Sequence, residues 1–394
     1  MRKATPIRFP VLAALLLAGS ALGQAQPAID VDVFDAGDVK AIPITLEGFT
    51  GETLALLKFD LFVQGFEFVD KAKAQFTIKG SNAGSINGAV YDHVRRGFIL
   101  NKRYQGGSLR RQAHTFANNA VEAITGSPGI GLTKIAFRQF HGRDTEIHIA
   151  DFDGHNSKRL THDNSIAAGP EWTPNNDSLF YYSYRRQNPD IYSHNVHTGV
   201  RRIVARYSGS NISPAVSPDG RRVAMVLSKA GSPDIWAASA DGTGLRRLTT
   251  TKEAESSPCW SPDGRWICFV SRASGRTALY KIPANGGAMS RIRTVGAFNA
   301  TEPDWSPDGK AIVFTTMRGG GVFEICIVPP GGGNVEVLAT GEDPSWAPNS
   351  RSLIFTSRSR GKRVLSVLDL SLIHISEPTR PERIGGGGVG GEKK

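Results

Sequence analysis

One turn-forming phrase occurs five times in this chain at nearly constant spacing. Its fullest form, Trp-Ser-Pro-Asp-Gly, occupies residues 260–264 and 305–309. Residues 216–220 lack the tryptophan, and residues 172–176 and 346–350 are more divergent copies. The prolines of successive copies are separated by 44, 44, 45 and 41 residues. A period of about 40–45 residues is typical of propeller blades, which are four-stranded sheets.

The residues around each phrase predict four strands per repeat. Pro presets φ for a type I turn, Asp can bond its own backbone, and Gly accepts the left-handed position that closes the hairpin. In the second full-length repeat, β-branched and aromatic runs follow at Arg222–Leu227 and Asp234–Ala238. A glycine turn and a short basic strand, Leu245–Thr249, complete the unit. The phrase therefore joins the first and second strands of each blade.

Counting the repeats predicts an all-β six-bladed propeller over residues 131–369. The first blade begins at Lys134–Phe140, a strand of the second type with no turn phrase before it, so this blade lacks its own first strand. The sixth blade begins at Trp346 and lacks a fourth strand, so the last blade is incomplete. A ring has to close because open ends leave unpaired strand edges. We expect the far end of the chain to supply the missing strand, yet no suitable segment follows Asp369.

A small α/β domain is predicted before the propeller, over residues 24–128. Helical spacing of apolar residues predicts helices at Glu52–Val63 and from Ser108 to Gly126. Five strands are expected, at Ala41–Thr45, Phe66–Val69, Gln75–Gly80, Gly88–His93 and Phe98–Tyr104. An N-terminal arm of alternating apolar and acidic residues precedes them. Such a pattern suits addition to the sheet edge of a partner protein, or equally the first strand of the α/β domain.

Both ends of the chain carry segments that we exclude from the fold. Residues 1–23 read as a cleaved signal peptide, with a basic start, a short apolar run at Phe9–Ala18 and a small-residue cleavage site. This predicts export to the periplasm of a Gram-negative bacterium. Residues 370–394 fit no strand of the repeat, and Leu370–Arg380 resembles the translation of a sequencing-library adapter. We therefore interpret residues 370–394 as a non-native tail.

Charge and cysteine content favour no special chemistry. The formal net charge is +11, but basic residues recur in every outer strand and read as a solvated surface, with no nucleic-acid-binding module. Cys259 and Cys268 flank one turn phrase, so a cross-strand disulfide is conceivable, whereas small buried side chains are the simpler interpretation.

Catalytic motifs are absent from the sequence. There is no Gly-x-Ser-x-Gly elbow and no His-Glu-x-x-His, and His148, His155 and His162 do not have the spacing of a metal cluster. We predict no catalytic residue, no metal and no cofactor. The alternatives are a propeller attached to a peptidase or other hydrolase, and a glycan-binding propeller. The second would need aromatic residues on the rim loops, which read as mostly small and polar.

The order of export signal, α/β domain and six-bladed propeller resembles the TolB family of the Tol–Pal system. Three stretches carry the resemblance: residues 104–126 with Ala113-His114-Thr115, residues 135–154, and Thr301-Glu302-Pro303-Asp304-Trp305. It covers about residues 27–369, and the first domain departs most from the family pattern. The resemblance implies a binding protein that bridges the peptidoglycan-associated lipoprotein Pal and the inner-membrane protein TolA.

The resemblance also implies where each partner binds. Pal would dock at the loops that enter the first strands, where loops of a propeller gather around the channel mouth on a rigid scaffold. The matching positions are Ser210, Asn211 and Ser213, Glu255 and Ser256, Thr301 and Glu302, and Glu342 and Asp343. Taken singly, each could equally be an ordinary turn residue. The TolA-binding arm would be Ile29, Asp30, Val31, Asp32, Val33, Phe34 and Asp35.

Overall fold

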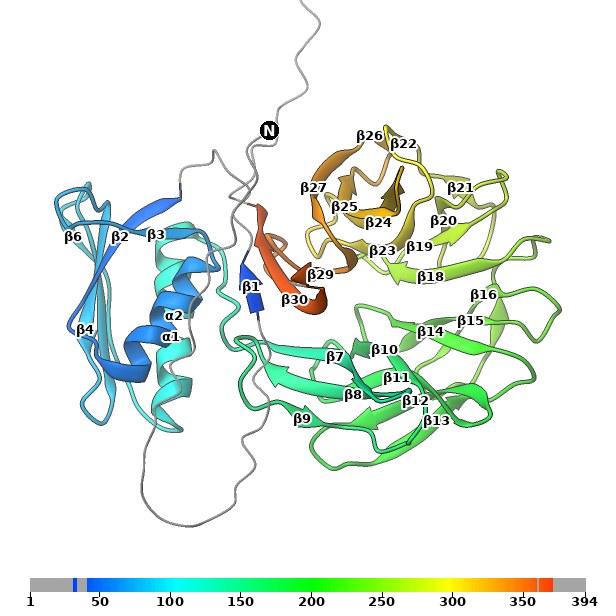
Figure 1. Ribbon diagram of the computed structural model, residues 1–394, viewed down its shortest axis with the longest axis horizontal. Coiled ribbons are helices and arrows are strands. Elements are labelled where there is room, and N and C mark those ends of the chain that lie inside the picture. The colour runs from blue at the N-terminus through cyan, green and yellow to red at the C-terminus, as the bar shows by residue number, and fades with distance from the viewer. Residues whose placement is uncertain (1–30, 34–40, 360, 371–394) are drawn as a thin grey trace, which may run out of the picture.

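The computed structural model describes residues 31–33, 41–359 and 361–370, and these form an α/β part beside a β-propeller (Figure 1). The fold class is therefore the one that the repeats predict. The predicted signal peptide, residues 1–23, lies outside the described residues, as do residues 371–394 of the predicted tail. No helix within the described residues is long and apolar enough to cross a membrane.

The α/β part is one mixed sheet with two helices on its propeller-facing side (Figure 1). Its elements are β2 (Ile42–Glu47), α1 (Gly51–Phe62), β3 (Phe66–Phe68), β4 (Phe76–Ser81), β5 (Ile86–Asp92), β6 (Gly97–Tyr104) and α2 (Leu109–Thr125). The strand order is β3-β2-β4-β5-β6, with β2 parallel to both neighbours. The Ser108 hydroxyl caps α2 by accepting from the Arg111 amide at 3.2 Å, and Gly126 ends it at φ +75°.

The propeller contains six blades, whose strands are numbered outward from the channel. The first blade has β7 (Lys134–His141), β8 (Asp144–Asp151) and β9 (Lys158–Arg159). The second blade has β10 (Ala167–Trp172), β11 (Ser178–Arg186), β12 (Asn188–Asn195) and β13 (Arg201–Ala205). The third blade has β14 (Asn211–Val216), β15 (Arg222–Leu227), β16 (Asp234–Ser239) and β17 (Arg246–Arg247). The fourth blade has β18 (Glu255–Trp260), β19 (Trp266–Ser271), β20 (Ala278–Pro283) and β21 (Ser290–Arg291). The fifth blade has β23 (Thr301–Trp305), β24 (Ile312–Arg318), β25 (Val322–Val328) and β27 (Glu336–Thr340). The sixth blade has β28 (Glu342–Trp346), β29 (Ser352–Ser359) and β30 (Lys362–Asp369). Two short strands, β22 (Thr294–Val295) and β26 (Gly333–Asn334), pair beside the fifth blade.

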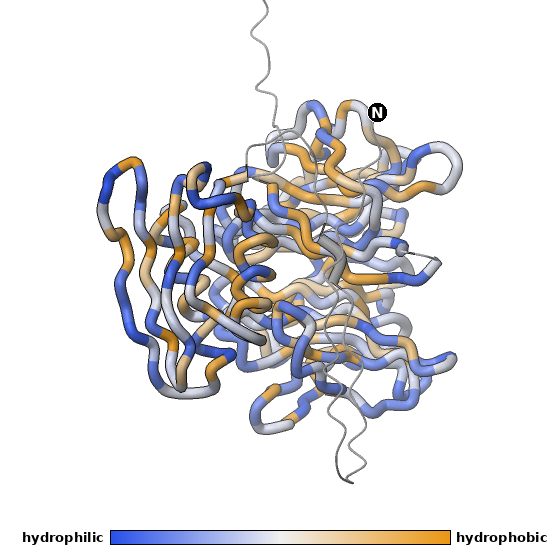
Figure 2. The backbone as a smooth tube through the Cα atoms, turned by 60° about the vertical axis from the view of Figure 1, so that its left-hand side comes forward, coloured by the Kyte–Doolittle hydropathy of each residue, from blue (hydrophilic) through white to orange (hydrophobic). Residues whose placement is uncertain are grey.

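Four of the five turn phrases make the same hydroxyl hydrogen bonds, which explains their repetition; the phrase at residues 346–350 has Ala347 at this position and keeps only the backbone bonds. In the fourth blade the Ser261 hydroxyl donates to Asp263 Oδ1 at 2.5 Å and accepts from the Trp266 amide at 2.9 Å. Gly264 closes the turn at φ +66°. The indole of Trp260 then donates to the Ala215 carbonyl of the preceding blade at 2.9 Å. One phrase therefore both turns the chain and joins neighbouring blades, whose buried apolar residues form one cluster. Figure 2 marks the hydrophobic stretches of the propeller strands in orange.

The sixth blade is completed in a way that the sequence did not reveal. The first blade has three strands, without a first strand of its own, as predicted. In the sixth blade the fourth, outermost position is occupied by β1 (Val31–Val33), which runs parallel to β30 with Val31 opposite Leu365 and Val33 opposite Val367. Residues 31–33 of the N-terminal arm are therefore a strand of the propeller and not of the α/β sheet, which corrects the alternative interpretation. The other arm residues, Ile29, Asp30, Phe34 and Asp35, lie outside the described residues.

The α/β part packs against the seam between the first and sixth blades. One apolar cluster joins Val63 after α1 to Phe152 of the first blade and to Ala347 and Val367 of the sixth. Gln64 fixes the same junction, since its carbonyl accepts from the Arg351 guanidinium at 2.5 Å and its side-chain oxygen accepts from the Ile130 amide at 3.0 Å. The two parts thus share a buried interface.

Candidate protein-binding rim

A strained bulge repeats in all five complete inner strands, β10, β14, β18, β23 and β28. Each strand shifts register at a residue with positive φ that is followed by proline. These residues are Gly169 (φ 61°), Ser213 (50°), Ser257 (49°), Glu302 (52°) and Asp343 (56°). A non-glycine residue in the left-handed region costs about 1–3 kcal/mol, and such strain concentrates at functional sites. Bulges also re-aim side chains, so this position is the candidate site.

Seven of the nine predicted rim residues lie at or beside these bulges with at least partial exposure. Ser213, Glu302 and Asp343 are bulge residues themselves, and Ser210, Ser256, Thr301 and Glu342 precede a bulge. Neighbouring blades meet here, because the Asp343 amide donates to Glu302 Oε2 at 3.0 Å. Burial, together with the charge of Asp343, raises the pKa of Glu302 to about 7.

Two predicted rim residues have a structural role instead. Asn211 is fully buried, where its side chain bonds the Tyr207 amide at 2.9 Å and the Pro189 carbonyl at 3.0 Å. Glu255 is also buried and accepts from the hydroxyls of Thr249 and Ser271, both at 3.0 Å. Each side chain is fully engaged in shaping its loop, so neither is presented to a partner in this conformation.

The sequence did not single out two carboxyl groups of the inner strands, Glu171 and Asp304. Each lies two residues after a bulge and directly before the tryptophan of a turn phrase. They belong to the second and fifth blades, which are opposite in a six-membered ring. The charge of Asp304 nevertheless contributes to the raised pKa of Glu171, so the two groups are close. Both therefore face the central channel. The Pro-x-Trp pattern could have signalled this position.

Burial shifts the protonation of both channel carboxyls. It raises the pKa of Glu171 to about 8, with a further contribution from the charge of Asp304. It raises the pKa of Asp304 to about 6, although that group accepts from the Trp346 amide at 2.8 Å and from the Ser345 hydroxyl at 3.2 Å. The carboxyl groups of Glu171 and Asp304 thus stay protonated to a higher pH than ordinary carboxyl groups do.

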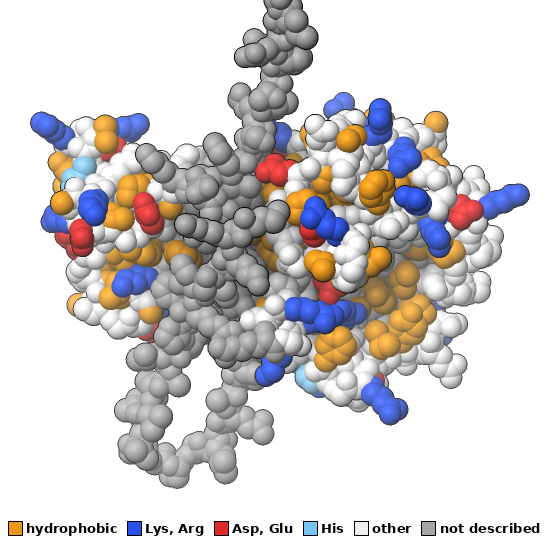
Figure 3. All heavy atoms as spheres, turned by 45° about the horizontal axis from the view of Figure 1, so that its top comes forward, with side chains coloured by type: hydrophobic (Ala, Val, Ile, Leu, Met, Phe, Trp, Pro, Cys, Tyr) orange, Lys and Arg blue, Asp and Glu red, His pale blue; other side chains and the backbone are white. Residues whose placement is uncertain are grey.

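Exposed aromatic residues lie around the rim, mostly on hairpins that the sequence analysis did not consider. We call the propeller face that carries the rim residues the rim face; the hairpins between second and third strands lie on it too. Phe140, Tyr184 and Phe323 lie on or beside these hairpins, and Phe298 lies in the loop before β23, with exposed fractions of 56, 37, 39 and 65%. Figure 3 shows hydrophobic side chains lying among lysine and arginine over the propeller. Aromatic and arginine side chains are enriched in protein–protein interfaces.

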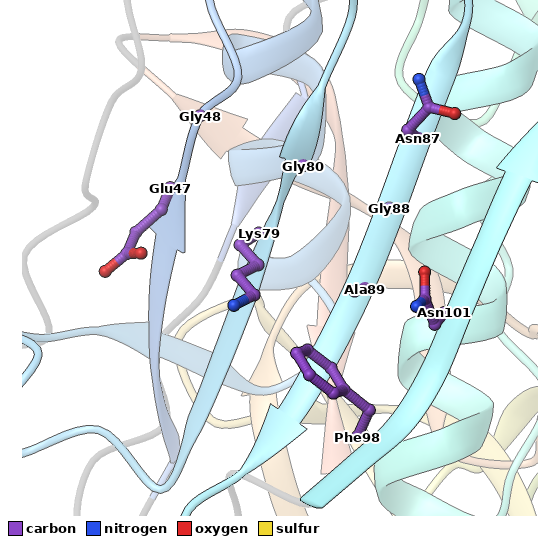
Figure 4. A pocket seen from close by; sticks show the side chains of 9 residues that line it. All are labelled: Glu47, Gly48, Lys79, Gly80, Asn87, Gly88, Ala89, Phe98 and Asn101. Atoms are coloured by element: carbon purple, nitrogen blue, oxygen red, sulfur yellow. The ribbon is translucent and has the colours of Figure 1, made fainter.

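Other parts of the described structure are weaker candidates for a binding site. A shallow hollow of about 580 Å³ lies on the α/β sheet (Figure 4), lined by Glu47, Gly48, Lys79, Gly80, Asn87, Gly88, Ala89, Phe98 and Asn101. No group of three or more His, Cys, Asp or Glu side chains within the described residues could hold a metal ion. Cys259 and Cys268 are partners across β18 and β19, and both are buried free thiols.

These features define a class of protein: a rigid six-bladed propeller whose inner strands carry repeated strained bulges at one face, as in scaffolds that bind at the channel mouth. The family model that matches is described as the TolB beta propeller domain, and it covers residues 121–373. The chain belongs to the TolB family.

Individual relatives agree with this assignment. The chain is 32% identical over 280 residues to the Tol-Pal system protein TolB of Anaeromyxobacter sp. (strain K), covering 61% of this chain and 64% of that protein. It is 35% identical over 162 residues to the TolB of Desulfosudis oleivorans, covering 41% and 37%. The alignments thus span less than two thirds of these relatives. The crystal structure of TolB from Acinetobacter baumannii superimposes with a TM-score of 0.77 at 22% identity, covering 87% of this chain and 92% of that one, which shows the shared fold.

Proposed function

We propose that this chain is a non-catalytic periplasmic scaffold of the Tol–Pal system that bridges Pal and TolA. In this role it maintains outer-membrane integrity and supports cell division. Its relatives are named as Tol-Pal system proteins, and the family resemblance supplies the two partners. The proposal assigns Pal to the rim and TolA to the N-terminal arm, Ile29–Asp35.

The observation that carries the Pal assignment is the repeated bulge. Five inner strands hold a positive-φ bulge residue at the same place, and in four of them that residue is not glycine, so the backbone geometry is kept although the side chains differ. In the third to sixth blades the exposed side chains at or near the bulge are Ser, Thr, Glu and Asp, which form hydrogen bonds to a partner without burying much charge. We keep Ser210, Ser213, Ser256, Thr301, Glu302, Glu342 and Asp343 as the proposed Pal contacts.

A pulldown tests this proposal. The tagged chain should retain Pal from an envelope extract of the source bacterium, and Asp343→Lys should weaken retention because it reverses an exposed charge at the mouth. A suitable control is Asp177→Lys, an exposed aspartate in the turn phrase of the second blade, on the opposite propeller face. Retention of no Pal would reject the scaffold function. Turnover of a peptide or ester substrate would favour the hydrolase alternative, and retention on a glycan column would favour the glycan-binding one.

The arm is tested separately. Removing residues 24–35, which include the whole proposed arm, should abolish TolA capture. Pal capture should persist, because the proposed Pal contacts lie in or beside the inner strands and β1 is the outermost strand of the sixth blade. Capture of TolA by the shortened chain would move the TolA contact elsewhere in the molecule.

A further inference from the structure

The hairpins between the second and third strands form an outer ring around the rim. They lie beside the loops that enter the inner strands, as two contacts show. The Ser210 amide donates to the Ser228 hydroxyl at 2.8 Å in the third blade, and the Tyr184 amide donates to the Ile166 carbonyl at 2.9 Å in the second. A partner that covers the rim must therefore also cover these hairpins.

Every hairpin of this ring presents an exposed cation. We call the following set the cationic ring: Arg143, Arg186, Lys229, Arg276, Arg318 and Lys362, one from each of the six blades. Arg318 pairs with Glu324 at 3.2 Å. The other five make no ion pair with any residue that the structure describes. Their charge is thus uncompensated within the described chain, which favours an anionic partner.

The opposite face shows a different arrangement. There the cation that follows each full turn phrase is paired with the aspartate of the same phrase. Arg265 Nε lies 2.6 Å from Asp263 Oδ2, and Lys310 Nζ lies 3.3 Å from Asp308 Oδ2. In the sixth blade Arg351 likewise pairs with Asp369 at 2.9 Å, whereas Arg221 of the third blade makes no ion pair within the described residues. Three of these four cations are therefore paired, against one of the six in the cationic ring.

Aromatic rings accompany two of these cations. Arg276 lies 5.7 Å from the ring centre of Phe298, and Lys229 lies 3.9 Å from that of Tyr207. Such pairs hold a cation over an apolar surface. Inside this ring, the bulges of the fifth and sixth blades carry acidic residues, Glu302, Glu342 and Asp343, of which Glu342 pairs with Arg363 at 2.9 Å. In these two blades the rim face therefore changes from acidic at the centre to basic at the perimeter.

We propose that the partner of the rim face is a protein whose docking surface is acidic and partly apolar around its edge and not acidic at its centre. This inference rests on the proposed function and specifies the surface that Pal from the same bacterium must present. Charges at an interface perimeter act mainly on the rate of association, because they steer the encounter and remain partly solvated. The cationic ring should therefore govern how fast the complex forms.

The test measures association rates with soluble Pal from the source bacterium at several salt concentrations. In the variant Arg186→Glu, Arg276→Glu, association at low salt should slow by roughly tenfold or more, and its dependence on salt should flatten or reverse. The matched control, Arg221→Glu, Lys310→Glu, changes the same net charge on the opposite face and should stay within about twofold of the unmodified chain. Equal melting temperatures would show that all three proteins are folded.

The outcomes separate the two proposals. Pal binding with equal rates in both double variants would overturn this inference and leave the scaffold function standing. Absence of Pal binding by the unmodified chain would overturn both. A third arm uses phosphatidylglycerol vesicles: if the ring variant loses vesicle binding while Pal association is unchanged, the cationic ring serves an anionic lipid surface, and the inference is wrong.

Discussion

Glu171 and Asp304 show how single residues set the properties of the channel. The two carboxyls come from opposite blades and lie in a narrow space where burial disfavours their charged forms. Their shifts concern stability as much as function. Because the folded state holds protons that the unfolded chain releases, stability falls as pH rises between the ordinary carboxyl range and the raised folded values.

The first prediction concerns this pH dependence. Since the pKa of Glu171 is about 8 against an ordinary value of 4.5, folding stability should decline as pH rises through that window. Glu171→Gln removes this ionisation, so the variant should melt at a higher temperature than the unmodified chain at pH 8 and show a smaller difference at pH 5. Thermal unfolding across pH checks this, with Glu253→Gln on an exposed loop as the control. Parallel curves for all three proteins would contradict it.

A second residue-scale prediction concerns His114, which lies between carboxylates of the two parts of the molecule. Its Nδ1 is 2.7 Å from Asp60 Oδ2, and its Nε2 is 3.5 Å from Asp153 Oδ2 of the first blade. Arg110 on the same helix also pairs with Asp153. His114→Ala leaves the fully buried Asp60 without its hydrogen-bond partner, whereas Asp153 keeps Arg110, so the free energy of unfolding should fall by about 3 kcal/mol.

Urea unfolding measures this change, with Arg111→Ala, an exposed residue of the same helix, as the control. A loss no larger than that of the control would mean that the His114 contacts do not hold the two parts together.

At the scale of elements, the strand β1 completes the sixth blade. Its three residues pair with Leu365, Ser366 and Val367, covering an edge of β30 that would otherwise present unpaired backbone groups. The proposed TolA-binding arm and this strand overlap, so capture of TolA through residues 31–33 would compete with blade completion.

The corresponding prediction uses proline. Asp32→Pro removes a backbone donor from β1, and proline disfavours a paired strand. Alternate amides of Leu365–Val367 should then exchange hydrogen for deuterium faster, while amides of the neighbouring Phe355 in β29 should not. Ala28→Pro, placed before the paired residues, is the control. Unchanged exchange in β30 would show that β1 contributes no protection in solution.

Elements were predictable from the sequence where a local rule governs them. The turn phrases fixed the strands on either side, and Ser108 and Gly126 marked the ends of α2, because these signals act within a few residues. The partner of β1 was not predictable, because a three-residue strand can pair with any free edge and its partner lies at the other end of the chain. Likewise the burial of Glu255 depends on hydroxyls that only the folded blade brings together.

At the scale of the whole molecule, the propeller has two distinct surfaces: the one that packs against the α/β part and the rim face. The α/β part lies across the seam between the first and last blades, where Val63, Phe152 and Ala347 share one apolar cluster. The rim face, which carries the cationic ring, is not covered by the α/β part and is the surface that we propose for partner binding. The channel carboxyls and the aromatic hairpins were missed by sequence reasoning because the fold, not the local pattern, brings opposite blades and adjacent loops together.

The parallel pairing of Val31 with Leu365 joins positions more than three hundred residues apart. Loop closure over such a length is slow compared with the formation of hairpins within a blade. If the chain crosses a membrane from its N-terminus, β1 emerges first and can pair only after β30 has also emerged. The outer edge of the sixth blade is thus covered last, and before that moment the chain still exposes the unpaired backbone groups of β30.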